Sequence, residues 1–212
     1  MGMNYKRYDI VIIPPQEIAE QAIALSQALQ PLGTFFVLDG QQFHPHLSLY
    51  HIPLEETSPA SVTAALEKLA AMIEPFTLTQ DTYYPDQGVW IGVRYVADKP
   101  VLDLHTNVID ATKEYRVIED DTRYKARWSE MSQKERENLK ACGWAHAYTL
   151  YSPHLTFTRL RQPYADVLAH LPQREFSFRV DHIGLYELGE NGTCVRLIAD
   201  FWLGEKEGRI LP

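Results

Sequence analysis

Short runs of apolar residues, many of them β-branched or aromatic, recur along the chain and are typical of strands in half-buried sheets. Such runs lie at 8–14, 35–40, 46–53, 76–84, 89–96, 154–160, 176–188 and 193–203. Turn-forming sequences at 85–88 and 189–192 separate four of these runs. The pattern therefore predicts eight strand segments, with a hairpin at each of the two turns.

Helix-forming sequences separate several of the strands. Residues 16–30 and 58–74 are rich in alanine and other strong helix formers, and Pro75 is expected to end the second helix. A third helix is predicted from about residue 99, and a short one over 162–171. Because hairpins and helices join most of the strands, we expect an α+β fold with antiparallel sheets.

Residues 113–140 form the most polar part of the chain, with positive and negative charges in near balance. Apolar periodicity is weak before Ser132. We therefore interpret this segment as a charged surface insertion, partly helical over 132–142, within a single domain that spans 1–212.

Composition narrows the class of protein. The net charge of −8 and the pI near 5.5 argue against binding of long duplex nucleic acid through phosphate neutralisation. Cys142 and Cys194 lack CxxC spacing, which argues against a disulfide framework or a thiolate zinc site. No apolar run approaches the ~18 residues of a membrane span, and no signal-like segment opens the chain. We expect a cytoplasmic protein with no membrane association.

Two four-residue segments share one unusual pattern. In His46-Leu47-Ser48-Leu49 the histidine and the hydroxyl residue fall on one face of a strand, and the two leucines fall on the other. His154-Leu155-Thr156-Phe157 repeats this arrangement. Each segment thus offers an imidazole beside a hydroxyl, a combination suited to binding an anion.

A histidine beside Ser or Thr on a strand is usually an ordinary solvent-facing residue. Here the pattern occurs twice, each time after a proline, and the surrounding segments 46–96 and 154–203 also resemble one another. Both contain a motif strand, a helix and a hairpin. We therefore expect two pseudo-symmetric lobes of antiparallel sheet with flanking helices, one motif in each, around a central cleft.

The sequences PHLSL and PHLTF resemble the paired H-x-[ST]-x motifs of the two-histidine (2H) phosphoesterase superfamily, which includes 2′-5′ RNA ligase-like and cyclic phosphodiesterase proteins. The strand GVWIGVR at 88–94 resembles the one that commonly follows the first motif. This resemblance implies that His46 and His154 are catalytic and that Ser48 and Thr156 bind phosphate. It implies no cofactor and no metal. The long segment at 113–140 departs from a compact member of the family.

The residue chemistry agrees with this resemblance. Opening a 2′,3′-cyclic phosphate needs a base for water, an acid for the leaving sugar oxygen and donors for the phosphoryl oxygens. Histidine serves either proton role near pH 7. The sequence does not say which histidine is the base, and it leaves the substrate's size and the oligomeric state open.

We expect a metal-independent phosphoesterase that acts on a 2′,3′-cyclic phosphate or a related phosphodiester at a nucleotide or RNA end. One alternative is an RNA 2′-5′ ligase, in which the same proton transfers run in reverse. Another alternative is a nucleotide-binding or RNA-end-binding module with little catalysis.

Aromatic residues near the motifs are candidates for stacking on a nucleobase. Tyr151, just before the second motif, is our first choice, ahead of Trp90 and Tyr50. Core or cleft-wall packing is the more common role of such residues.

Further charged and metal-binding candidates are weaker. The cluster His44, His46 and His51 could suggest a metal site, but His44 precedes Pro45 at the strand entrance, His51 has the opposite strand parity to His46, and no nearby carboxylate completes a set, so we do not favour one. Three basic residues of the insertion could contact phosphate, although charge runs are usually solvated: Arg123, Lys125 and Arg127. Four other histidines are interpreted as surface or structural residues: His105, His146, His170 and His182.

Overall fold

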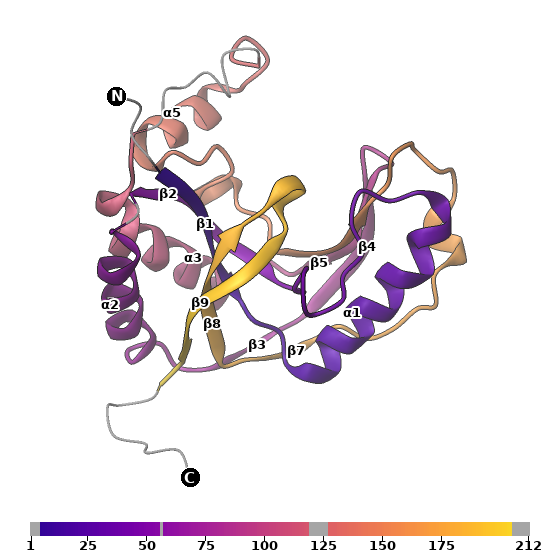
Figure 1. The fold of residues 1–212 in the computed structure, drawn as a ribbon, viewed down its shortest axis with the longest axis horizontal. Coiled ribbons are helices and arrows are strands. Elements are labelled where there is room, and N and C mark those ends of the chain that lie inside the picture. The colour runs from indigo at the N-terminus through magenta and orange to yellow at the C-terminus, as the bar shows by residue number, and fades with distance from the viewer. Residues whose placement is uncertain (1–4, 56, 119–126, 205–212) are drawn as a thin grey trace.

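The fold consists of antiparallel sheets and covering helices, as expected for an α+β protein (Figure 1). The computed structural model describes residues 5–55, 57–118 and 127–204. The helices are α1 (Gln16–Leu29), α2 (Pro59–Ala70), α3 (Lys99–Thr112) and α5 (Gln133–Cys142). The strands are β1 (Tyr5–Ile12), β2 (Leu47–Glu55), β3 (Phe76–Leu78), β4 (Gln80–Asp86), β5 (Trp90–Tyr95), β6 (His154–Arg159), β7 (Phe178–Val180), β8 (His182–Leu188) and β9 (Cys194–Trp202).

Each motif strand lies in a sheet with strands from the other half of the chain. The four-stranded sheet has the order β2-β1-β8-β9, and the three-stranded sheet has the order β4-β5-β6. The first motif strand, β2, therefore shares its sheet with the late hairpin β8–β9. The second motif strand, β6, joins the early hairpin β4–β5. A lobe of this protein is thus assembled from both halves of the sequence.

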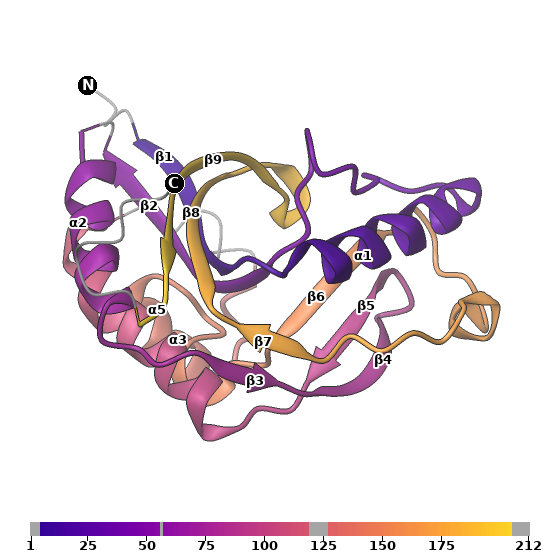
Figure 2. The same ribbon diagram turned by 90° about the horizontal axis from the view of Figure 1, so that it is seen from below.

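Helices cover the two sheets separately. α2 and α3 pack on the four-stranded sheet, and α1 packs against β6 of the three-stranded sheet (Figure 1). The short ribbon β3–β7 lies between the two sheets (Figure 2). One continuous cluster of buried apolar side chains joins both sheets, including Ile10 from β1 and Phe157 from β6. This shared core holds the motif strands in a fixed relation to one another.

Both motif strands contain a β-bulge directly after their hydroxyl residue. In β2, Ser48 pairs with Val11 and Tyr50 pairs with Ile10, which leaves Leu49 as the extra residue. In β6, Phe157 is the corresponding extra residue, between Thr156 and Thr158. A bulge shifts the side-chain parity of every residue beyond it.

The outer edge of β2 is closed by side chains rather than by another strand. The Tyr151 hydroxyl donates to the Ser48 carbonyl at 3.1 Å, and His105 Nδ1 lies 2.7 Å from the Leu49 carbonyl. Because a carbonyl only accepts, His105 Nδ1 must carry the hydrogen. These bonds give two backbone oxygens at the bulge hydrogen-bond partners on the edge strand of the sheet.

Two sequence-based predictions of regular structure are wrong. Residues 35–40 form no strand, since the Leu38 amide donates to Ser26 of α1 and the Asp39 carboxylate accepts from three amides in a turn. This region is connected to β6 by the Phe35 amide, which donates to the Arg159 carbonyl, and by Thr158 Oγ1, which donates to the Phe36 carbonyl, and Thr34 forms an isolated bridge with Leu160. Over 162–171 there is a single 3₁₀ turn in place of a helix, and Asp166 adopts a positive φ just before it.

Other predicted helices and hairpins are present, but some of them end at different residues. The helix expected at 58–74 ends at Ala70, before Pro75, and its last turn tightens into i→i−3 bonds. Both hairpins are present, and Gln87 and Gly88 each have positive φ in the first turn, between Asp86 and its partner Trp90. None of the helices in the described part of the chain has the length and apolar character needed to cross a bilayer.

The charged insertion contains one well-anchored helix, α5, in agreement with its predicted partial helicity. Ser132 and Glu135 form a reciprocal capping box at its start. Buried Asn138 donates from its amide to the carbonyls of Ala145 and Ala147, at 3.0 and 2.7 Å. Since Trp144 and His146 line the cavity described below, Asn138 helps to shape its wall. Residues 119–126 lie outside the described part.

We predict that Asn138→Ala lowers the free energy of unfolding by about 1–3 kcal/mol, because two buried carbonyls lose their donor. Urea unfolding followed by circular dichroism measures this loss. Glu137→Ala, at an exposed position on the same helix, should stay within about 0.5 kcal/mol of the parent. Equal stability of the two variants would contradict the proposed role of Asn138.

Candidate active site

The four residues singled out by the motifs line one cavity of about 410 Å³. His46 and Ser48 reach it from the four-stranded sheet, and His154 and Thr156 reach it from the three-stranded sheet. The sequence pattern thus corresponds to a shared site at which residues from two distant segments of the chain meet.

The two imidazoles are held in the same way. His46 Nδ1 lies 2.8 Å from the His44 carbonyl, and His154 Nδ1 lies 2.8 Å from the Ser152 carbonyl. A carbonyl oxygen only accepts, so Nδ1 carries the hydrogen in both rings. In a neutral ring this leaves the Nε2 lone pair free. Each histidine is therefore oriented by the backbone two residues earlier and keeps Nε2 for proton transfer.

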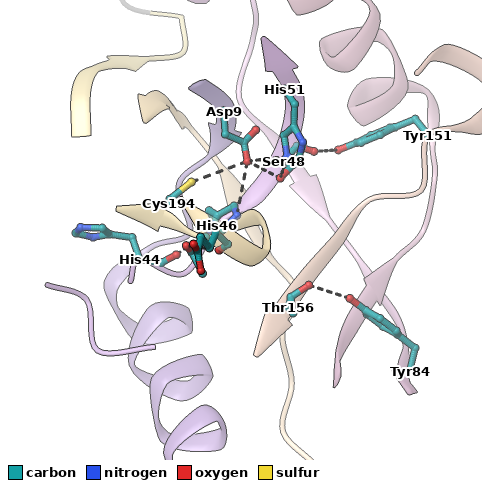
Figure 3. A network of polar contacts seen from close by, with 11 residues as sticks. Asp9, His44, His46, Ser48, His51, Tyr84, Tyr151, Thr156 and Cys194 are labelled. Atoms are coloured by element: carbon teal, nitrogen blue, oxygen red, sulfur yellow. Dashed lines mark hydrogen bonds and ion pairs between the residues drawn. The ribbon is translucent and has the colours of Figure 1, made fainter. Parts of the chain in front are cut away.

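A buried carboxylate lies beneath the first motif. Asp9, from β1, is fully buried, and its Oδ2 accepts a 2.6 Å hydrogen bond from the Ser48 hydroxyl (Figure 3). The same oxygen lies 3.7 Å from His46 Nε2 and 3.3 Å from His51 Nε2. The Ser48 hydrogen is thus engaged in this structure, and Ser48 can donate to a phosphate only after leaving Asp9.

The second motif has a phenol where the first has a carboxylate. The Tyr84 hydroxyl lies 3.1 Å from Thr156 Oγ1 (Figure 3). Burial raises the pKa of Tyr84 to about 12, so this phenol remains protonated and able to donate. When Tyr84 donates, the Thr156 hydrogen is free to point into the cavity. The two halves of the site therefore hold their histidines in the same way but give their hydroxyl residues different hydrogen-bond partners.

Gly92 makes room for this contact. It lies on β5 between Tyr84 and Thr156, its partners on the neighbouring strands. A Cβ at this position would lie 2.9 Å from the Tyr84 hydroxyl and 2.3 Å from the Leu155 carbonyl. Only glycine allows the tyrosine to reach across β5 to the motif threonine.

Positive charge surrounds His154. The pKa of His154 is lowered from its ordinary value of 6.5, mainly because the surrounding protein atoms reduce the solvation of the charged ring. The side chain is nevertheless exposed. The bond to the Ser152 carbonyl opposes this effect, and charges on His46 and Arg94 add to it. The Arg94 guanidinium also stacks over the Tyr84 ring at 4.8 Å. His154 is thereby biased toward its neutral form.

His51 belongs to the site, contrary to the prediction from strand parity. The bulge at Leu49 places His51 on the same side as Ser48, and its Nε2 lies 3.2 Å from Ser48 Oγ. Its ring stacks on Trp144 at 5.2 Å between centroids. The sequence pattern contains no signal for this bulge. The expectation that no carboxylate accompanies these histidines is also wrong, because Asp9 supplies one from β1.

Asp9 could have been found from the sequence, since it is the one charged residue in the apolar run YDIVII. An acidic residue inside a buried strand is rare unless it is paired. Cys194, from β9, has no comparable signal, and its Sγ lies 3.9 Å from Asp9 Oδ2. Within the described residues, Asp9, His46 and Cys194 form a group whose ligand atoms all lie within 4.8 Å of one another, close enough to hold a metal ion.

The stacking candidates differ in exposure. Tyr151 lines the cavity but is only 7% exposed, and one face of its ring stacks on His105 at 3.9 Å. It therefore offers little free surface to a base. Tyr50 is fully buried and donates its hydroxyl to the Cys142 carbonyl. Trp90, together with Trp144, lines the cavity and is partly exposed.

The remaining histidines differ in their burial and in the groups that they contact. Burial lowers the pKa of His105 to about 4, and its Nε2 accepts from the Tyr148 amide, as expected for a neutral structural residue. His146 is exposed and lines the cavity, whereas His182 stacks on Trp202. His44 packs against Tyr186. The His170 side chain lies outside the described part.

The basic candidates of the insertion are only partly described. Arg127 is exposed and is not among the residues that line the cavity. Arg123 and Lys125 lie outside the described residues.

The two-sheet fold and the paired histidines define a phosphoesterase-like protein, and sequence comparison gives the family. A profile described as the 2′-5′ RNA ligase superfamily matches residues 14–192. The chain belongs to this superfamily of 2H phosphoesterases. No curated protein sequence matches the chain.

Solved structures share the fold at low sequence identity. The chain is similar to LigT of E. coli in its apo form, with 17% identity, a TM-score of 0.59 and coverage of 95% of this chain and 99% of that one. It is also similar to the protein TT0787 of Thermus thermophilus, with 17% identity, a TM-score of 0.60 and coverage of 94% and 99%. Further matching LigT crystals are described as complexes with NADP+, ATP and 3′-AMP.

We predict that Gly92→Ala lowers the free energy of unfolding by about 1–3 kcal/mol, because the added methyl group overlaps backbone and the Tyr84 hydroxyl. Chemical denaturation measures the change. Asp81→Ala, at an exposed position on the adjacent strand, serves as the control and should be nearly neutral. A Gly92→Ala protein as stable as this control would show that the site tolerates a Cβ here.

Proposed function

We propose that this protein is a metal-independent phosphoesterase that opens a 2′,3′-cyclic phosphate, or a related phosphodiester at a nucleotide or RNA end. His46 and His154 act as its acid and base. The observation that carries the proposal is their matched anchoring: both rings are fixed through Nδ1 to a backbone carbonyl, and both line the same cavity. An ordinary surface histidine needs no such anchor.

The surroundings of the two rings favour one assignment of roles. His154 has a lowered pKa, so its neutral Nε2 is suited to take a proton from water. The water oxygen then attacks phosphorus, and the bond to one sugar oxygen breaks. His46 donates its Nε2 proton to that oxygen. The Asp9 carboxylate, 3.7 Å from His46 Nε2, faces the imidazolium as a counter-ion.

Thr156, Arg94 and Ser48 supply the candidate contacts to the phosphoryl oxygens. Thr156 has a free hydrogen when Tyr84 donates to it. Arg94 lines the cavity and adds a full positive charge. Ser48 joins them once its hydroxyl leaves Asp9. Such donors stabilise the charge that develops on the phosphoryl group.

A small nucleotide-like substrate agrees with the size and lining of the site. A volume of about 410 Å³ is within the usual range for small-molecule pockets, and Trp90 and Trp144 give it aromatic walls. The description of LigT complexes with ATP, NADP+ and 3′-AMP supports nucleotide binding by a protein of this fold. The net charge of −8 also favours a short substrate over a long polyanion.

The direct test is hydrolysis of 2′,3′-cyclic nucleotides and of oligonucleotides that end in a cyclic phosphate, measured in EDTA. We expect turnover by the parent protein, and a loss of about 10²–10⁴ in kcat/KM for His46→Ala and for His154→Ala. His182→Ala, a histidine outside the cavity, is the matched control and should retain activity.

If neither His46→Ala nor His154→Ala reduces turnover, the mechanism is ruled out. If EDTA abolishes the activity, a metal is required. A second arm offers a cyclic-phosphate end together with a free 5′-hydroxyl end. Joined product would favour the ligase alternative. Tight binding of nucleotide without either reaction would favour the binding module.

The lowered pKa of His154 predicts the pH profile. The base must be neutral, and the neutral form prevails above its pKa, so kcat/KM should rise through a midpoint below pH 6.5. Activity is lost as the pH falls through this midpoint. A rate–pH series with the parent protein measures the acid limb, and a midpoint at or above 6.5 would contradict the assignment of His154 as base.

A further inference from the structure

Three side chains that could bind a metal ion lie together at the edge of the cavity, and the proposed reaction does not use them as a metal site: His46, which lines the cavity, and the buried Asp9 and Cys194 behind it. Asp9 Oδ2 lies 3.7 Å from His46 Nε2 and 3.9 Å from Cys194 Sγ, and all three atoms are within 4.8 Å of one another (Figure 3). Ligand atoms around tetrahedral zinc, with bonds of ~2.0–2.3 Å, are separated by about 3.3–3.8 Å. Two of the three spacings are therefore already close to those of a zinc site.

The three donor residues lie on, or directly next to, hydrogen-bonded strands. Asp9 is on β1, His46 directly precedes β2, and Cys194 begins β9. The His44 amide donates to the Cys194 carbonyl at 3.0 Å, which links the cysteine to the chain two residues before His46. Little backbone movement is therefore needed to bring the three donors onto one ion.

The charge of this cluster also calls for a cation. Asp9 is fully buried, and its Oδ1 has no hydrogen-bond partner among the described residues. Two imidazole rings, those of His46 and His51, lie within 4 Å of its other oxygen, Oδ2. A buried carboxylate without full pairing is costly. A divalent ion would neutralise it.

The donor types select the metal. Magnesium and calcium prefer shells of oxygen, whereas a set of imidazole, carboxylate and thiolate suits zinc. We propose that Asp9, His46 and Cys194 form an inhibitory Zn²⁺ site beside the cavity, which it meets at His46. Binding releases the Cys194 proton to solvent as the sulfur becomes a thiolate ligand. His51 lies next to this group, with its Nε2 3.3 Å from Asp9 Oδ2.

Inhibition follows because zinc would occupy His46 Nε2, the atom that donates a proton in the proposed reaction. This consequence rests on the proposed function, but metal binding itself does not. The site would thus regulate the enzyme without taking part in its chemistry.

Cobalt binding tests the site without reference to activity. We expect EDTA-treated, buffer-exchanged protein to bind one Co²⁺, with a thiolate-to-cobalt absorption band and the visible bands of a tetrahedral ion, and Zn²⁺ should displace it. Cys194→Ser should lose the thiolate band and bind Zn²⁺ at least ~10-fold more weakly. Cys142→Ser, the matched change at the other buried cysteine, should keep both properties.

Absence of the thiolate band in the folded parent protein would overturn the proposal, whatever the stability of the variants. So would zinc affinity that is unchanged in folded Cys194→Ser. Activity assays then separate the two proposals. One equivalent of Zn²⁺ should inhibit the parent protein, and excess EDTA should restore it. A thiolate band in a protein that hydrolyses no cyclic phosphate would leave the metal site standing and refute the proposed function.

Discussion

Backbone pairing between opposite ends of the chain holds the two motif histidines at one cavity. β1 pairs with β2 on one side and with β8 on the other, and β5 pairs with β6. Each motif strand is thereby locked to a hairpin from the other half. Since the two sheets share a continuous apolar core, the histidines cannot move apart without exposing that core.

The two halves of the site have the same framework and different electrostatics. Both have a backbone-anchored imidazole, a hydroxyl residue and a bulge after it. Under Ser48, however, lies the Asp9 carboxylate, while Thr156 meets the neutral phenol of Tyr84. This difference is the physical basis for the distinct proton roles that we propose for the two histidines. Among the described residues, it also gives only the first half a donor set suited to zinc.

Local sequence was a good guide to the site where the chemistry follows from adjacent residues. The alternation in a strand put His46 beside Ser48 and His154 beside Thr156, and all four line the cavity. The same rule failed for His51, because a single extra residue in β2 reversed its parity. Asp9 is the one charged residue of the apolar run YDIVII, but no spacing in the sequence connects it with His46. Residues 35–40 resembled a strand but found their hydrogen bonds in α1 and in a turn.

Four features follow from the order of residues alone: the α+β class, most helices and strands, the paired motifs and the resemblance to the 2H phosphoesterases. These features depend on periodicity and on short-range residue spacing, which a chain carries in its order. Three other features emerge only in the folded chain: the motif strands exchange hairpins, a bulge adds His51 to the site, and Asp9 and Cys194 lie beside His46. Those contacts join residues up to 185 positions apart. They arise from strand register and shared burial, which no local pattern encodes.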